Sequence, residues 1–333
     1  MPRKIWVSTI AFHGTSKPTV EENLKAAHHL LEAACAVQPD IVCLPEVFAS
    51  VGTEYEGVEE VAQPVPGPIT DMAAEVARHH STCVICPLME ARDGRVYNSA
   101  VLIDRQGHIA GIYEKIHPVT SSSDYTVLEH GVTPGKEAKV FETDFGRLGI
   151  LICFDINWPQ EWAELKRQGA EVVFWPSAYN GGFPLQVYAF LHNYYVVSST
   201  HGDSRIIDLT GEILEQTGRA SPVVSAQIDL EKGLFHGDFN WAQLEPLRAR
   251  YGRDVAVGIY HDEALMTIES HRQDLTVAQI IEEMGLELLP DYLARNEQAQ
   301  DGLREGRKPT PQHPPYLGRQ QYLGESANER MGE

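Results

Sequence analysis

The same order of expected elements occurs twice along the chain, and this repetition constrains the fold more than any other feature. Each copy has a helix, a short apolar strand, a second helix, another strand and a hairpin. The short strands and hairpins are Asp40–Glu46 and Ser99–Ile109 in the first copy, then Glu171–Ser177 and Ser204–Ile213 in the second. Two halves of this kind, each a mixed sheet covered by helices, would bury sheet against sheet. We therefore expect an α/β fold, a four-layer α-β-β-α sandwich with two mixed sheets and an internal pseudo-two-fold repeat; chance similarity of ordinary βαβ units is the alternative.

The character of the sequence changes after about Ser270. Leu275–Leu288 has the apolar periodicity of an amphipathic helix, which Pro290 is expected to end. From Arg295 the chain is polar and rich in Pro and Gly, and such a segment cannot bury enough apolar surface to fold alone. We therefore expect one domain over residues 1–270 and a C-terminal helix with an extended Pro-rich tail over 271–333. The tail is expected to be disordered or to contact a partner subunit.

The overall charge limits the kinds of partner. The chain of 333 residues carries 47 acidic and 27 basic side chains, a net charge of −20. A protein this acidic is not expected to bind nucleic acid. The sequence contains no apolar run long enough to span a membrane and no signal-peptide pattern, so we expect neither membrane association nor secretion.

Five cysteines, an odd number, indicate reduced thiols and a cytoplasmic location. Cys83 and Cys86 have the spacing of a metal-binding or redox pair, but no second pair follows. Val84 and Ile85 between them fit a strand, so core packing is favoured over zinc binding. No metal site is therefore predicted.

Cys153 follows an apolar run, Gly149–Ile152, that is short enough to be a buried strand. Pro159 suits the first position of a helix that extends to Gln168. The thiol is therefore expected at a strand-to-helix turn, where backbone N–H groups can stabilise an oxyanion and the helix start favours a thiolate. A buried structural cysteine is the alternative.

Two charged residues also end apolar strands, Glu46 and Lys115. Charged side chains at the ends of buried strands cost free energy unless they pair or take part in chemistry. A carboxylate base, a cation for the oxyanion and a thiol nucleophile are together what acyl transfer requires. Individually, the two charges are also explained by a cap or ion pair and by a surface cation.

Three segments carry a family resemblance: Leu44-Pro-Glu46, Tyr113-Glu-Lys-Ile-His117 and Ile152-Cys-Phe-Asp155. In this order they resemble the three catalytic motifs of the nitrilase superfamily of carbon–nitrogen hydrolases, and the resemblance covers residues 4–270. It implies the sandwich fold, with Glu46 as general base, Lys115 as oxyanion stabiliser and Cys153 as the nucleophile that forms a thioester. Glu129 matches the family's second glutamate, which would orient Lys115 or the substrate. No metal or organic cofactor is implied.

The residues around the motifs bear on the substrate, which we expect to be a small amide or carbamoyl compound that loses ammonia or an amine. Phe154-Asp155 stands where nitrile-cleaving relatives carry Trp-Glu, and Asn157-Trp158 stands where relatives of acidic substrates often carry arginine. Phe154, Asn157, Trp158 and Tyr179 are the candidate substrate-binding residues. The alternatives are nitrile hydrolysis and a non-catalytic scaffold of the same fold. Members of the family usually pair through helices beside the active site, so a homodimer or larger homo-oligomer is expected.

Overall fold

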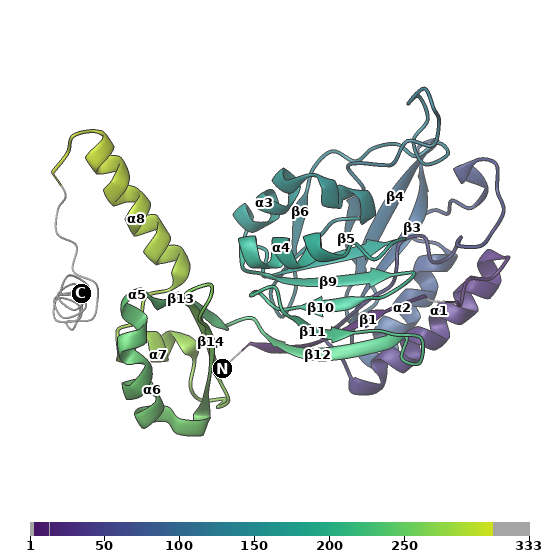
Figure 1. The fold of residues 1–333 in the computed structure, drawn as a ribbon. Coiled ribbons are helices and arrows are strands. Elements are labelled where there is room, and N and C mark those ends of the chain that lie inside the picture. The colour runs from purple at the N-terminus through teal and green to yellow at the C-terminus, as the bar shows by residue number, and fades with distance from the viewer. Residues whose placement is uncertain (1–2, 13, 309–333) are drawn as a thin grey trace. The chain divides into compact units, whose positions relative to one another are not determined.

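The computed structural model describes residues 3–12 and 14–308, and the chain forms two compact units (Figure 1). One unit is Ile5–Ile228; the other contains the described residues from Asp229 onward together with Arg3 and Lys4. The boundary between the units therefore lies between residues 228 and 229, and not after residue 270 as the sequence predicts. Residues 230–270, which the sequence places in the first domain, instead contribute a three-stranded sheet to the second unit.

The first unit contains two six-stranded mixed sheets. The first has the order β12 (Val223–Asp229), β1 (Lys4–Ile10), β2 (Ile41–Cys43), β3 (Cys83–Arg92), β4 (Arg95–Ile103) and β5 (Ile109–Glu114). The second has the order β11 (Ile213–Gln216), β10 (Arg205–Ile207), β9 (Tyr195–Thr200), β8 (Val172–Ser177), β7 (Arg147–Ile150) and β6 (Lys139–Glu142). When the second sheet is read from β6 to β11, each strand corresponds to the strand at the same position of the first sheet, read from β12 to β5. The repeat predicted from the sequence is therefore confirmed in the topology.

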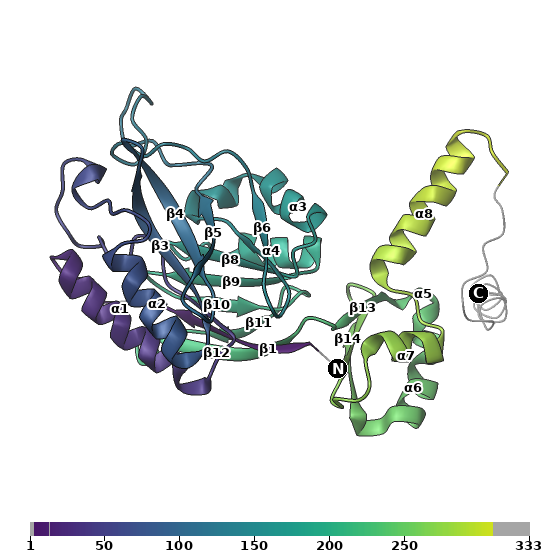
Figure 2. The ribbon, with the colours of Figure 1, turned by 180° about the vertical axis from the view of Figure 1, so that it is seen from behind.

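Helices cover the outer faces of both sheets, α1 (Val20–Ala34) and α2 (Pro68–His80) on the first, α3 (Pro159–Arg167) and α4 (Phe183–His192) on the second (Figures 1 and 2). The sheets face each other, and side-chain hydrogen bonds link them: the Thr9 hydroxyl donates to the Ser198 carbonyl at 2.6 Å, and the Ser199 hydroxyl donates to the Cys43 carbonyl at 2.8 Å. The predicted four-layer sandwich is confirmed.

Local sequence explains the helix positions. Thr19 caps α1 by accepting a hydrogen bond from the Glu22 N–H, and the apolar face of this helix buries Ala27 and Leu31 completely. Pro159 occupies the first turn of α3, as its fixed φ favours. Short 3₁₀ turns lie at Cys35–Val37, Val58–Glu60, Cys153–Asn157, Trp241–Gln243 and Gly252–Asp254.

The second unit has a three-stranded sheet of order β13 (Gly233–His236), β15 (Leu265–Ser270) and β14 (Val255–Tyr260). Its helices are α5 (Gly237–Asn240), α6 (Leu244–Tyr251), α7 (Val277–Met284) and α8 (Leu289–Arg304). A separate core packs between them, with Phe235, Met266, Ile268 and Ile280 fully buried. This sheet was missed because its strands carry no functional motif and no repeat partner.

The expectation of a polar tail from Arg295 is wrong for residues 295–304, which continue α8. Pro290 lies in the first turn of this helix, where proline promotes a helix instead of ending one. Arg295 and Glu287 form an ion pair that ties the helix to the segment before it. Residues 309–333, which include most of the predicted Pro-rich tail, lie outside the described residues.

Candidate active site

The two sheets bring the three motif residues to one place. Glu46 lies just beyond β2 of the first sheet, Lys115 directly follows β5, and Cys153 lies beyond β7 of the second sheet. All three are nearly inaccessible, with exposed fractions of 3%, 1% and 7%. The carboxyl ends of parallel strands from two facing sheets therefore create one buried cluster of a carboxylate, an ammonium group and a thiol.

The Glu46 carboxylate is the centre of the cluster. Its Oε1 accepts hydrogen bonds from Lys115 Nζ and from Asn98 Nδ2, both at 2.8 Å, and its Oε2 accepts the Ala178 N–H at 2.8 Å. The Cys153 thiol lies close enough to this carboxylate to help lower its pKa. His201 Nε2 contacts the Glu46 carbonyl oxygen at 2.6 Å, so the main chain of the glutamate is held as well as its side chain.

Glu129 is the second carboxylate of the cluster. Its Oε1 accepts from Lys115 Nζ at 2.5 Å and from the Val119 N–H at 3.0 Å, while its Oε2 accepts from Asn98 Nδ2 at 2.9 Å. Lys115 thus donates to two carboxylates, and an ammonium group has three N–H bonds. One of the three remains for another acceptor.

The backbone at Cys153 has a left-handed conformation, with φ of 47°, which L-residues other than Gly, Asn and Asp rarely adopt. Val47, next to Glu46, has φ of 48°, and Glu129 itself has φ of 40°. Left-handed backbone at or beside three chemically active side chains is the strain expected of a functional site. The Trp175 indole N–H donates to the Cys153 carbonyl at 3.0 Å and helps to hold this turn in place.

Asp155 supports the turn from inside the protein. Its carboxylate is fully buried and accepts from the Tyr113 hydroxyl at 2.7 Å, the His117 N–H at 2.9 Å and the Ile152 N–H at 2.9 Å. Burial raises the pKa of Asp155 to about 6. Because Tyr113 and His117 flank Lys115 in sequence, this carboxylate joins the lysine segment to the cysteine turn.

Electrostatics determine which groups are charged. Burial alone would raise the pKa of Glu46, but the Lys115 charge and the hydrogen bonds from Lys115, Cys153 and Asn98 lower it. Burial would lower the pKa of Lys115, yet the nearby Glu46 and Glu129 carboxylates raise it. At neutral pH the pair is therefore ionised.

The pKa of the Cys153 thiol rises to about 12, first through burial and then through the Glu46 charge. Burial therefore outweighs any stabilisation of a thiolate by the start of the helix, and that expected contribution stays a prediction. Lys115, Ser177 and the Ala178 N–H act in the opposite direction, but they do not outweigh burial. The resting state is a neutral thiol beside an ionised base.

The candidate substrate-binding residues are distributed over two neighbouring turns. Tyr179 is 44% exposed, and its pKa is raised to about 12, first by partial burial and then by its neighbours Cys153 and Glu46. Phe154 packs edge-on against Trp158, with ring centroids 5.2 Å apart, and Trp158 stacks on His117 at 3.7 Å. Asn157 is exposed, and its amide donates to the Phe154 carbonyl at 3.1 Å. Tyr179 thus lies beside the thiol, and Asn157 points its amide back to its own turn.

The sequence profile of the carbon-nitrogen hydrolase family matches residues 9–233. The chain belongs to the carbon-nitrogen hydrolase family. The matched region includes Glu46, Lys115, Glu129 and Cys153, and it ends near the boundary of the first structural unit. The family assignment and the sandwich fold predicted from the motifs are thereby confirmed, and the chain is a hydrolase of carbon–nitrogen bonds.

Curated relatives of this carbon-nitrogen hydrolase are amidases. A deaminated glutathione amidase of Synechocystis sp. is 29% identical over 249 residues, which cover 67% of this chain and 91% of the relative. An omega-amidase of Xenopus tropicalis is 29% identical over 238 residues, 64% of this chain and 85% of the relative.

Solved structures share the fold. A Saccharomyces cerevisiae protein of branch 10 of the nitrilase superfamily superposes with a TM-score of 0.58 at 20% identity, over 75% of this chain and 94% of that one. An amidase from Nesterenkonia sp. superposes with a TM-score of 0.58 at 16% identity, over 68% of this chain and 90% of that one. The α-β-β-α sandwich is therefore common to these proteins and this hydrolase.

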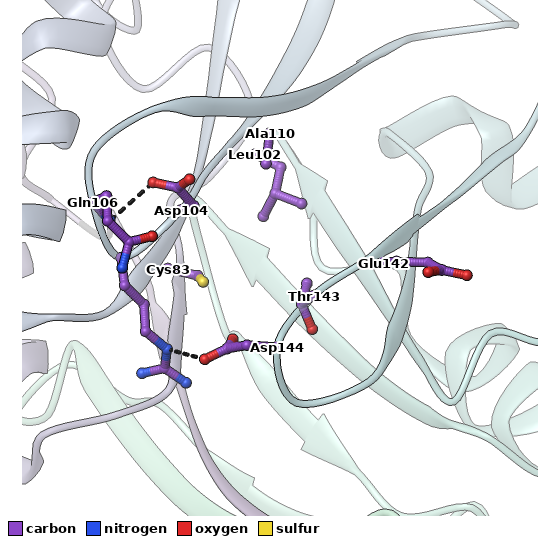
Figure 3. Close-up of a pocket in the computed structure, with 9 residues that line it drawn as sticks. Cys83, Leu102, Asp104, Gln106, Ala110, Glu142, Thr143 and Asp144 are labelled. Atoms are coloured by element: carbon purple, nitrogen blue, oxygen red, sulfur yellow. Dashed lines mark hydrogen bonds and ion pairs between the residues drawn. The ribbon is translucent and has the colours of Figure 1, made fainter.

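A cavity of about 290 Å³ lies elsewhere in this carbon-nitrogen hydrolase, at the opposite ends of the strands (Figure 3). It is lined by the β4–β5 turn, the β6–β7 turn and the start of β3. Its guanidinium, Arg105, donates to Asp144 and Asp40 at 2.7 Å each and to the Ser81 carbonyl at 2.8 Å. Cys86 lies in the hydrophobic core of the first half, as the sequence indicates, whereas Cys83 faces this cavity.

Two polar residues in the cluster were missed by sequence reasoning, Asn98 and His201. Asn98 lies within the apolar strand β4, and a lone amide in such a strand is the signal that could have identified it. His201 follows β9 at the same edge as Glu46, but one histidine after a strand carries no specific signal. Among residues 3–12 and 14–308 no group of His, Cys, Asp or Glu is arranged to hold a metal ion, and none of the helices there has the length and apolarity to cross a membrane.

Proposed function

We propose that this carbon-nitrogen hydrolase cleaves small neutral amides or carbamoyl compounds through a thioester on Cys153. The observation that carries the proposal is the buried cluster itself: the Cys153 thiol lies beside the Glu46 carboxylate and each affects the pKa of the other, while Lys115 and Asn98 hold the carboxylate in place. A thiol with a pKa near 12 needs a base at neutral pH, and Glu46 is positioned to be that base.

The reaction proceeds in two halves. Glu46 removes the thiol proton, Cys153 Sγ bonds to the carbonyl carbon, and the oxyanion accepts the third N–H of Lys115 and the N–H of Phe154. The C–N bond then breaks as Glu46 returns the proton to the leaving nitrogen, so ammonia or an amine departs and a thioester remains. Glu46 next deprotonates water, the hydroxide attacks the thioester, and the proton returns to the thiol as the acid leaves.

Glu129 serves in this scheme as the residue that orients Lys115. It accepts from the lysine and from the Val119 N–H, so both its position and that of the ammonium group are fixed. Phe154, Asn157, Trp158 and Tyr179 are proposed to line the acyl-binding side. The curated relatives, which are amidases, favour an amide over a nitrile as the substrate.

The charge of the cluster supports a neutral substrate. Glu46 and Glu129 together carry two negative charges, and Lys115 balances one of them. Among the main electrostatic neighbours of Cys153 and Tyr179, Lys115 is the one cation that lowers the pKa of each. A carboxylate on the substrate is recognised best by a guanidinium fork, and the turn after Cys153 offers Asn157. An anionic acyl group would therefore meet repulsion without a compensating ion pair.

The experiment compares the diamide and the half-amide of one dicarboxylic acid, which have the same size and differ in charge. Ammonia release is measured for both and for the matching dinitrile, with Cys153→Ala as the blank. We expect the diamide to have the highest kcat/KM, by about tenfold or more over the half-amide. Faster turnover of the half-amide would refute the neutral-substrate proposal, and ammonia from the dinitrile alone would refute amide hydrolysis. Hydroxylamine should divert the acyl group to a hydroxamate if a thioester forms.

We also propose that the protein is a cytoplasmic homo-oligomer. All five cysteines are free, as expected of a reducing compartment. Helix α4 exposes apolar side chains, with Phe183 71% and Leu191 61% accessible, and such a face is suited to subunit contact. Light scattering should give at least a dimer, and Phe183→Ser with Leu191→Ser should reduce its mass; a monomeric wild type would contradict the proposal.

A further inference from the structure

Asn98 contacts all three charged members of the cluster. Its side-chain amide donates to Glu46 Oε1 at 2.8 Å and to Glu129 Oε2 at 2.9 Å, and its backbone carbonyl accepts the Lys115 N–H at 2.8 Å. The residue is 1% exposed. One amide nitrogen thus uses both of its hydrogens on the two carboxylates, which the single ammonium of Lys115 also bridges.

The amide oxygen of Asn98 has no hydrogen-bond partner among the described residues and is buried. A buried acceptor without a partner costs free energy, so other interactions of the amide must outweigh that cost in this orientation. Turning the amide over would place this oxygen against two carboxylate oxygens. The pair Glu46 and Glu129 therefore fixes the amide with both N–H groups toward them.

Two carboxylates this close have a general difficulty. When two such groups share a site, one of them normally retains a proton because both cannot be ionised together. Lys115 supplies one positive charge for two negative ones, and within residues 3–12 and 14–308 the Asn98 amide adds the only other donors that reach both groups. A protonated Glu46 could not accept the thiol proton.

We propose that Asn98 is a positioning residue that keeps Glu46 and Glu129 ionised together, so that Glu46 is available as the base at neutral pH. This inference rests on the proposed function and assigns a role to a residue outside the three motifs. The groups that face Glu46 are Lys115 after β5, Cys153 after β7, Glu129 from the 116–138 loop, Tyr179 after β8 and His201 after β9. Of these groups, only Lys115 hydrogen-bonds to both carboxylates, and the Asn98 amide is the other described group that does so.

The sign of the effect follows from the donors. Asn98 stabilises the ionised form of Glu46 and so lowers its pKa, in addition to the larger effect of Lys115. Removing the amide should raise the pKa of Glu46, and the acid limb of every reaction that needs Glu46 as base should move to higher pH.

The main variant is Asn98→Asp, which keeps the side-chain shape and replaces the donors with a third carboxylate; Asn98→Ser, which keeps one donor, is the milder variant. The readout is the rate of Cys153 alkylation by iodoacetamide against pH, followed by mass spectrometry of the Cys153 peptide. We expect the acid limb to move up by more than about one pH unit in Asn98→Asp and by less in Asn98→Ser. Where an amide substrate is turned over, kcat/KM should follow the same shift, and raising the pH should restore part of the loss.

Asn240→Asp is the matched control, because Asn240 is also 1% exposed and also donates twice, to the His236 and Glu287 carbonyls. It should lower the melting temperature like any buried aspartate and leave the pH profile of Cys153 unchanged. Coincident acid limbs in wild type and both Asn98 variants would overturn the proposal, as would an equal shift in Asn240→Asp. Because alkylation needs no substrate, it separates this proposal from the proposed function, which fails if no amide or carbamoyl compound releases ammonia.

Discussion

The two ends of the paired sheets carry charged clusters that have similar ion pairs and differ in solvent exposure. At the amino ends of the parallel strands, Arg105 pairs with Asp144 beside a cavity of about 290 Å³ (Figure 3). Arg105 also pairs with Asp40. At the carboxyl ends, Lys115 meets Glu46 and Glu129 next to a thiol. In each cluster one cation pairs with two carboxylates near a cysteine, and the cavity lining adds the carboxylates of Asp104 and Glu142.

Exposure and donor number separate the two clusters. Asp144 is 59% and Arg105 21% exposed in their side chains, so solvent shares in balancing the charges, and the planar guanidinium satisfies two carboxylates and a carbonyl together. Lys115 is 1% exposed and has a spare N–H bond. The candidate active site is therefore distinguished by buried charge and a spare N–H donor, whereas the cavity at the other end has charges that solvent and paired groups balance.

Replacing each cysteine by serine should give the largest difference in kcat/KM between the two ends. Cys153→Ser should lower kcat/KM by about 10⁴-fold or more, since a weaker nucleophile replaces the sulfur that forms the acyl-enzyme. Cys83→Ser is the control at the cavity, and it should leave kcat/KM within about twofold. Ammonia release measures both. A Cys153→Ser protein with wild-type turnover would place the nucleophile elsewhere.

Replacing Lys115 should give the next largest change in kcat/KM. Lys115→Met should lower kcat/KM by about 10²- to 10³-fold, because an oxyanion donor is lost. The same change removes the charge that lowers the pKa of Glu46, so the acid limb of the pH profile should move to higher pH. The buried carboxylates lose their partner as well, and the free energy of unfolding should fall by about 3–5 kcal/mol. Measuring kcat/KM between pH 4 and pH 9 well below the melting temperature separates the effects; an unshifted acid limb would contradict the role of Lys115.

Thiol reactivity compares the two ends without a substrate. Burial raises the pKa of Cys83 to about 11 and that of Cys153 to about 12, so by acidity alone Cys153 should be the slower to alkylate at pH 7. Glu46 can take the proton of Cys153, and we expect this to reverse the order by about 10²-fold. Glu46→Gln should abolish the advantage. Peptide mass spectrometry after timed iodoacetamide treatment gives both rates, and Cys83 reacting first in the wild type would show that Glu46 does not act as a base.

The repeat and the three motifs suffice to predict the sandwich and the convergence of Glu46, Lys115 and Cys153, because strand order and strand ends follow from local patterns. Asn98 could not be predicted, since its role depends on an amide from β4 meeting carboxylates that are distant in sequence. The raised pKa of Cys153 was also missed, because burial is a property of the whole packed cluster. The helix at Leu289–Arg304 was missed because proline was taken as a break, although the same residue can start a helix.

Replacing Arg105 at the cavity end should have the smallest effect on activity. Arg105→Ala removes three hydrogen-bonded contacts, to Asp40, Asp144 and the Ser81 carbonyl, so the free energy of unfolding should fall by about 1–3 kcal/mol. Arg105→Lys keeps the charge but loses the planar fork, and should recover only part of that stability. Neither variant should change kcat/KM by more than about twofold at a temperature where both are folded. Urea unfolding gives the first quantity and ammonia release the second; a tenfold loss of turnover in folded Arg105→Ala would mean that the cavity end also takes part in catalysis.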